Sequence, residues 1–360
     1  MRETTFFAKR FVIIFFSIVV CGLCSVGTLI FVVDPWLHYR TPRSWFSYQI
    51  GSYDDTYEAL GIVTNLNYNA LIIGTSQSIN LKCYETSELF EEKDVVRASI
   101  TGASYKEIEL VLDKAFKCHP DIDVVIRPLD APGLLEDKDY LEHPESKGLS
   151  YLYNEEIVDD ISYLWNLNAL IRLADLSSYS IKGINRGDKY LFDDFPIKTE
   201  GFTWTRLSDI QEMKQFNEED RKTVEATIQQ NVLKNIEEHP DTEFYYFFTP
   251  YSIAQCDSWF RAGELNRILR AQLCAIELMT GYDNLHLFSF WNVPNLAENY
   301  DFYANMSHYN KEVGSQILYW MAKGEYEITE LNKDAYSSWL LGYYLKFGGN
   351  CLKIYGKFNE

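Results

Sequence analysis

A short apolar run at residues 70–73 stops at Gly74 and leads at once into a group of hydroxyl residues that includes Ser76. An uninterrupted apolar run that ends at a glycine is typical of a strand buried in a parallel sheet. Residues 77–91 then have the polar start of a helix. This order predicts an α/β fold with Ser76 at the carboxyl edge of the sheet, where backbone N–H groups at a helix start can bind an oxyanion.

A simpler interpretation of the same stretch is structural. Thr75, Ser76 or Ser78 could serve only as the N-cap of the following helix, a position that Ser and Thr favour. Taken alone, the stretch favours the cap. The distant segment at residues 305–310, which contains His308, shifts the balance toward a chemical role.

The rest of the chain repeats the alternation of strand and helix. Further strands are predicted at residues 94–100, 123–130, 243–249 and 284–289, and helices at 105–117, 262–280 and 311–322. Ser104 with Glu107 has the spacing of a capping box at the first of these helices. Strands that alternate with helices predict a three-layer α/β/α sandwich with a mostly parallel five-stranded sheet and right-handed crossovers.

The N-terminus carries a membrane signal. Residues 11–33 contain no charge and are long enough to cross a bilayer as a helix. Arg2, Lys9 and Arg10 precede them, so the positive-inside rule predicts a cytoplasmic tail at residues 1–10 and an extracytoplasmic remainder. A cleaved signal peptide is the alternative, but the length of the apolar run favours an uncleaved anchor and a cell-membrane location.

Four further segments follow the anchor. Residues 34–66 are aromatic and turn-rich and are expected to be a juxtamembrane linker, and residues 67–325 are expected to form the α/β domain. Within that domain, residues 131–240 are acidic and mostly helical, and are predicted to be an insertion that caps the sheet edge. Residues 326–360 form a C-terminal extension with an apolar-aromatic patch that could pack on the domain or lie at the membrane interface.

Composition narrows the possible partners. The net charge is −19, and the basic residues at the N-terminus do not contribute to that excess. An acidic surface disfavours nucleic acid, because Lys and Arg supply most of the affinity for phosphates. The seven cysteines show no metal-ligand spacing, so no metal or cofactor is expected, while one disulfide remains open.

Five residues fall at or beyond predicted strand ends. They are Ser76, Gly102, Asp130, Tyr251 and His308. In open α/β sheets, ligands bind at the carboxyl ends of the strands. Because the five converge on one edge, they predict a site there more strongly than any one of them does.

These residues resemble the motifs of the SGNH (GDSL-like) hydrolases, and most closely a membrane-anchored bacterial branch. That branch includes alginate O-acetyltransferase-like proteins and the D-alanyl transfer protein of teichoic acid synthesis. Gly74-Thr75-Ser76 matches the nucleophile block, Gly102 the oxyanion glycine, and His308 the terminal base. The anchor followed by Asp34-Pro35-Trp36, and the His308-Tyr309-Asn310 run, add to a resemblance that covers roughly residues 34–325.

The resemblance implies an SGNH-like, flavodoxin-like sandwich and a serine mechanism. Ser76 would attack an acyl carbonyl after His308 removes its proton, since a serine hydroxyl is a poor nucleophile without a base. The backbone N–H groups of Ser76 and Gly102 would hold the oxyanion. Gln77, next to Ser76, is placed with the oxyanion and substrate-binding residues.

Two positions depart from the family pattern. Asn305 stands three residues before His308, where the family has Asp, and Asp301 is a candidate to replace it. An Asp-to-Asn change in a Ser-His-Asp triad can cost ~10⁴ in turnover. Asp130 stands near the position of an oxyanion-hole Asn, where a carboxylate would oppose the developing charge unless it is protonated or turned away.

The resulting hypothesis is a membrane-anchored, extracytoplasmic serine esterase or O-acyltransferase that modifies a cell-envelope polysaccharide. Its partners would be an acylated glycan or acyl donor and, by the resemblance, a membrane-bound O-acyltransferase. The alternative is an SGNH-fold subunit with little or no activity that binds glycan or scaffolds an acyl-transfer complex; Asn305 and Asp130 favour it. A third interpretation is an anchored structural protein, in which Ser76 and His308 would not meet.

Overall fold

The computed structural model describes residues 2–48, 50, 56–91, 93–143, 161–182 and 209–355. Its centre is a five-stranded parallel sheet in the order β2-β1-β3-β4-β5. The strands are β1 (Ala70–Gly74), β2 (Val95–Ser99), β3 (Val124–Leu129), β4 (Glu243–Phe248) and β5 (Leu285–Ser289). All five predicted strands are present, and the predicted α/β fold with a parallel sheet is confirmed.

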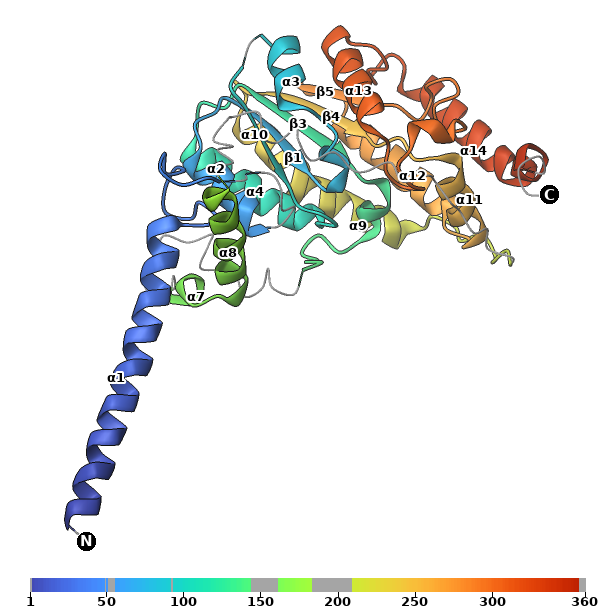
Figure 1. Ribbon diagram of the computed structural model, residues 1–360. Helices are drawn as coiled ribbons and strands as arrows, with labels where there is room; N and C mark the ends of the chain where they lie inside the picture. Colours follow the sequence, from blue (N-terminus) through green and yellow to red (C-terminus); the bar gives the residue numbers. More distant parts are fainter. Residues whose placement is uncertain are drawn as a thin grey trace.

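Helices cover both faces of the sheet (Figure 1). On one side α4 contacts α2 and η5, and α9 contacts α12; on the other side α3 contacts α13. The first layer comprises α2 (Thr56–Asn65), α4 (Tyr105–Cys118), α9 (Glu218–Ile228), the π-helix η5 (Gln229–Leu233), α10 (Lys234–Glu238) and α12 (Leu265–Met279). The second comprises α3 (Cys83–Leu89) and α13 (Lys311–Lys323). These positions are those that right-handed crossovers produce for this strand order.

Burial explains why the central elements form. Every residue of β1, β2 and β3 is buried, as expected for strands covered on both faces. Helix α4 buries Ile108, Val111, Leu112 and Ala115, whose spacing places them on one face. The predicted capping box is present: Ser104 accepts a bond from the Glu107 backbone N–H, and the Glu107 carboxylate accepts one from the Ser104 N–H.

The helix predicted at residues 77–91 is wrong as a single element. The chain forms a short 3-10 turn, η1 (Ser76–Ser78), and then starts α3 at Cys83. The interruption has a tertiary cause. Asn80 donates its side-chain N–H to the Tyr309 carbonyl at 2.6 Å and so links this turn to the loop before α13.

The region after the apolar helix is more structured than the sequence suggested. Helix α1 (Arg2–Val33) is followed by Asp34, whose carboxylate accepts bonds from the backbone N–H groups of His38, Tyr39 and Arg40 at 2.7–3.0 Å. Helix α2, which the sequence analysis did not predict, then packs on α4 and β2. Within α1, residues Lys9–Val33 are long and apolar enough to cross a membrane.

The segment at residues 131–240 is distributed over three places. Its first part, η2 (Ala131–Leu135), borders the carboxyl edge of the sheet. Helices α7 (Ile161–Leu164) and α8 (Leu167–Ile181) lie beside α1 (Figure 1). Helices α9 to α10 form the crossover between β3 and β4. Its described helices therefore do not form the expected cap over the sheet edge. Residues 144–160 and 183–208 of this segment lie outside the described residues.

The C-terminal extension packs against the α/β domain. Helix α14 (Lys333–Tyr355) contacts α11 (Ile253–Arg261) and α12, and buries Leu340 and Tyr344, so the apolar-aromatic patch packs on the domain. Among the cysteines whose side chains the structure describes, Cys21, Cys24, Cys118 and Cys274 are free thiols.

Candidate active site

A cavity of about 350 Å³ lies at the carboxyl edge of the sheet. Ser76, Gly102, Asp130, Tyr251 and His308 all contribute to its lining. They follow β1, β2, β3, β4 and β5 respectively, so the parallel strands bring together residues that are far apart in the chain. The convergence expected from the strand ends is present.

The turn that carries Ser76 is tightly constrained. Gly74 lies beside Pro128 of the neighbouring strand, and a Cβ on Gly74 would stand 2.8 Å from the proline ring. Thr75 caps η1, with its hydroxyl accepting from the Gln77 N–H at 3.3 Å. Ser78 donates its hydroxyl to the Thr75 carbonyl at 2.7 Å. The N-cap is therefore Thr75, and the Ser76 hydroxyl is directed elsewhere.

The Ser76 hydroxyl lies next to the imidazole of His308. The distance from Ser76 Oγ to His308 Nε2 is 2.8 Å, within hydrogen-bond range. Three contacts hold the His308 loop against the serine turn: Gln77 Nε2 donates to the Ser307 carbonyl at 2.9 Å, the Tyr309 hydroxyl donates to the Gln77 carbonyl, and Asn80 binds the Tyr309 carbonyl. Gln77, expected among the substrate-binding residues, uses its amide N–H for this loop.

Helix α13 also holds the His308 loop against the turn that carries Ser76. Asn310 caps it by accepting from the Val313 N–H at 3.0 Å. Gly314, in the first turn of the helix, lies so close to Asn80 that a Cβ would stand 2.1 Å from the Asn80 carbonyl oxygen. Glycine at this position lets α13 approach the serine turn, which sets the distance between Ser76 and His308.

Asn305 orients the imidazole. Its side-chain Oδ1 lies 2.9 Å from His308 Nδ1, and it also accepts from the backbone N–H groups of Ser307 at 3.0 Å and His308 at 3.1 Å. Two backbone donors aimed at this atom require it to be the carbonyl oxygen and not the NH₂ group. An acceptor at this position requires Nδ1 to carry the hydrogen, which leaves the lone pair on Nε2 facing Ser76.

Asp301 lies outside this arrangement. Its side chain is exposed, and its backbone carbonyl accepts a bond from Asn310 at 2.8 Å. The group at Nδ1 of His308 is the amide of Asn305, a neutral acceptor.

Asp130 faces the site from β3. Its Oδ2 accepts from the Thr75 hydroxyl at 2.7 Å and its Oδ1 from the Tyr251 hydroxyl at 2.6 Å. Burial raises the pKa of Asp130, while the Tyr251 and Thr75 bonds and the charge of His308 oppose the rise. Because both carboxyl oxygens accept these hydroxyls, Asp130 is not available as an oxyanion donor in the manner of an Asn.

The surroundings of His308 favour its neutral form. Burial lowers its pKa below the usual value, and the charge of Asp130 acts in the opposite direction. A lowered pKa leaves the imidazole neutral near pH 7, which is the form that can accept a proton. The negative charge of Asp130 would then favour the imidazolium after proton transfer.

Backbone donors are available near the nucleophile. Among the described residues, no hydrogen bond uses the backbone N–H of Ser76 or of Gly102. Both residues line the cavity, and Gly102 has a φ of +72°, a conformation that glycine adopts at little cost. The arrangement can therefore supply two N–H groups to a developing oxyanion.

The sequence analysis missed several cavity residues, above all Glu136, Arg127 and Trp259. Burial, followed by the charges of Glu142, Asp130 and Glu107, raises the pKa of Glu136 to about 7. Glu136 closely follows the end of β3, so the rule that placed Asp130 at the sheet edge could have found it. Arg127 is fully buried and donates to the Asn231 carbonyl at 2.8 Å.

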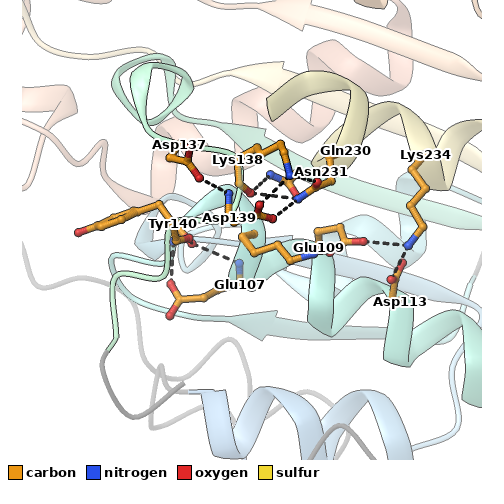
Figure 2. Close-up of polar contacts among 12 residues, drawn as sticks. Glu107, Glu109, Asp113, Asp137, Lys138, Asp139, Tyr140, Gln230, Asn231 and Lys234 are labelled. Carbon is orange, nitrogen blue, oxygen red and sulfur yellow. Dashed lines mark hydrogen bonds and ion pairs between the residues drawn. The ribbon is translucent and has the colours of Figure 1, made fainter. Parts of the chain in front are cut away.

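A polar network holds the Glu136 side of the cavity in place (Figure 2). Lys138 donates to Gln230 at 2.7 Å, and Asn231 donates to the Lys138 carbonyl at 2.8 Å. Lys234 pairs with Glu109 and Asp113 of α4 at 2.9 and 2.6 Å. The loop after η2 is thereby tied to the π-helix η5, a type of helix that is frequent at functional sites.

Comparisons with known proteins add little. No family model and no curated protein matches this chain. Among solved structures, it is similar to a protein from Streptococcus pneumonia provisionally described as a platelet activating factor, with 14% identity and a TM-score of 0.37 over 74% of this chain and 89% of that chain. The function therefore has to be judged from the geometry of the site.

Proposed function

We propose that this protein is a serine esterase or O-acyltransferase of the SGNH-like type. The observation that carries the proposal is the 2.8 Å contact between Ser76 Oγ and His308 Nε2, with Asn305 selecting the tautomer that frees Nε2. A serine with a hydrogen-bonded base, a second residue that orients the base, and nearby backbone donors form the constellation needed for acyl transfer.

The reaction would proceed in two steps. Ser76 Oγ attacks the acyl carbonyl while its proton moves to His308 Nε2, and the N–H groups of Ser76 and Gly102 stabilise the oxyanion. The leaving alcohol takes the proton back from Nε2, which leaves an acyl group on Ser76. Water or a glycan hydroxyl then attacks that ester and gives its proton to Nε2. As the acyl–Oγ bond breaks, Ser76 Oγ takes this proton back from Nε2, and the acid or the acylated glycan is released.

Location supports an envelope substrate. Helix α1 is long and apolar enough to span a membrane, and Arg2, Lys9 and Arg10 precede its apolar part. We propose that α1 anchors the domain on the extracytoplasmic side, by the positive-inside rule. The resemblance of the motifs to membrane-anchored SGNH-like enzymes suggests an acylated polysaccharide as substrate and a membrane-bound O-acyltransferase as partner.

The test is hydrolysis of p-nitrophenyl acetate by the full-length protein in detergent micelles, with intact-mass analysis of the quenched reaction. The proposal predicts release of nitrophenol and an acetyl adduct on the wild type. Ser76→Ala should lose both, while Ser78→Ala, at a hydroxyl of the same turn that donates to the Thr75 carbonyl, should keep them. A folded wild type that neither turns over nor becomes acylated would favour the non-catalytic, glycan-binding or scaffolding subunit.

A further inference from the structure

Helices α7 and α8 lie alongside the apolar helix α1 (Figure 1). The contact is specific: Trp165, between the two helices, donates its indole N–H to the Leu23 carbonyl at 3.0 Å. A Cβ on Gly27 would stand 3.1 Å from the same indole ring, so the absence of a side chain there makes room for it. Ile30 and Val33 continue the buried face of α1.

The contact lies deep along α1. A helix rises ~1.5 Å per residue, so Leu23 is ~15 Å before the end of α1 at Val33 and ~21 Å beyond Lys9. The hydrocarbon layer of a bilayer is ~30 Å thick. If the apolar part of α1 starts at the inner boundary near Lys9, Leu23 lies inside this layer, and Trp165 lies there with it.

The surface of α7 and α8 suits such a location. Residues 161–181 contain two charged residues, and neither is fully exposed: Arg172 is buried and pairs with Glu58 at 2.9 Å, and Asp175 is half-buried. The exposed large side chains are instead apolar, namely Ile161 (59%), Trp165 (43%), Leu167 (69%), Leu170 (36%), Ile171 (51%) and Ile181 (87%). In a chain of net charge −19, an uncharged apolar surface is a marked exception.

Polarity also changes along α8 in a consistent direction. Leu167, Leu170 and Ile171 lie in its first half, close to the part of α1 that Trp165 contacts. The second half carries Ser177, Ser178 and Ser180, and Ser180 accepts a bond from the Ser47 N–H at 2.8 Å in the region after α1. The first half of α8 is therefore apolar and its second half polar, and this change runs in the same direction as α1.

We propose that α7 and the first half of α8 form a second membrane element, buried in the outer half of the bilayer beside α1 and in contact with lipid acyl chains. The proposal rests on α1 being the membrane anchor. Lipid is the occupant favoured by the structure because the apolar surface is continuous with the lipid-facing surface of α1 and because exposed charge is absent from residues 161–181. A two-helix contact would also fix the orientation of the domain, which a single tether would leave free.

The experiment uses the full-length protein in phosphatidylcholine vesicles. An NBD fluorophore is attached to single cysteines placed at Leu167, Ile171, Val20 of α1 and Lys222 of α9, after replacement of Cys21, Cys24, Cys118 and Cys351. The chosen positions are exposed, so the label displaces little of the core. Quenching by doxyl-labelled lipid is compared with quenching by iodide present on both sides of the membrane.

The proposal predicts that labels at Leu167 and Ile171 are quenched by doxyl lipid within about twofold of the label at Val20, and resist iodide, while the label at Lys222 behaves in the opposite way. Lipid quenching at Val20 with iodide quenching at both α8 positions would overturn this inference and leave the anchor intact. Iodide quenching at Val20 as well would overturn the anchor. Protection of the α8 labels from both quenchers would indicate a second copy and not lipid, and would also overturn the proposal.

Discussion

The side-chain oxygen of Asn305 lies 2.9 Å from Nδ1 of His308, in the position that a carboxylate occupies in a Ser-His-Asp triad. The backbone N–H groups of Ser307 and His308 fix the orientation of this amide. Two duties of the triad acid are thereby separated. Asn305 selects the histidine tautomer. The negative charge that raises the pKa of the imidazole comes from Asp130.

Asn305→Asp should increase activity. The carboxylate can accept the same three N–H groups and adds a charge that stabilises the imidazolium. Since the tautomer is already correct, the gain should be smaller than the ~10⁴ seen when an Asn supports the wrong tautomer; we expect about tenfold to a hundredfold in kcat. Steady-state hydrolysis of p-nitrophenyl acetate measures it. Asn305→Ala should reduce kcat, and an Asp variant no faster than the wild type would contradict this division of roles.

Asp130→Asn tests whether the charge of Asp130 supports the imidazolium form of His308. Removing the charge should lower kcat by about tenfold, which corresponds to ~1.4 kcal/mol of lost transition-state stabilisation. It should also move the acid limb of the pH profile to lower pH, because the charge of Asp130 raises the pKa of His308. An increase in kcat would instead mean that the carboxylate opposes the oxyanion in the wild type.

The pH dependence of the wild type follows from the direction of the His308 shift. Burial lowers the pKa of His308, so the neutral base predominates above the folded pKa and is lost as the pH falls through it. We expect kcat/KM to decline about tenfold per pH unit on an acid limb whose midpoint lies below 6.5. An acid limb centred above pH 7 would show that His308 is not the base or is not desolvated.

Glu136 should add a second ionisation to the profile. Its pKa is raised to about 7, so its charge changes in the range where the enzyme would work. Glu136→Gln should remove an inflection near pH 7 while the acid limb from His308 remains. The effect should be larger for a substrate that fills the cavity than for p-nitrophenyl acetate. An unchanged profile with both substrates would show that Glu136 does not influence the reaction.

Gly314→Ala tests the junction that holds Ser76 against His308. The new Cβ would lie 2.1 Å from the Asn80 carbonyl oxygen, so α13 must shift. We expect a loss of about 1–3 kcal/mol in the free energy of unfolding together with slower acylation of Ser76. Gly342→Ala is the matched control, because no atom lies within 4 Å of its Cβ position in α14. Equal behaviour of the two variants in thermal unfolding would contradict the proposed close packing.

The sheet and the position of Ser76 could be predicted because they depend on local patterns. Each strand is a short, mostly apolar segment that ends at or just before a glycine or a polar residue, and strand ends in a parallel sheet share an edge. The break before α3 could not be predicted, because the bond from Asn80 to the Tyr309 carbonyl exists only in the folded chain. The role of Asn305 was equally hidden, since it depends on which backbone N–H groups point at its oxygen.

The position of α8 depends on a similar long-range contact. Helical spacing in the sequence extends over residues 159–174 and so covers only the first half of α8, and its place beside α1 follows from the fit of Trp165 against Gly27. Neither residue carries a pattern that indicates the other. The sequence predicted a helical insertion over the sheet edge; of its described residues, those of η2 lie at that edge, whereas α7 and α8 lie beside α1.

The central claim is that Ser76 is activated by His308. The most direct measurement is labelling of the full-length protein with a fluorophosphonate probe, which reacts with activated serines, in wild type, Ser76→Ala and His308→Ala. The account predicts labelling of the wild type and loss of labelling in both variants, with Ser78→Ala retained as a labelled control. A wild type that keeps its folded circular dichroism spectrum yet takes no label, or labelling that persists in Ser76→Ala, would contradict it.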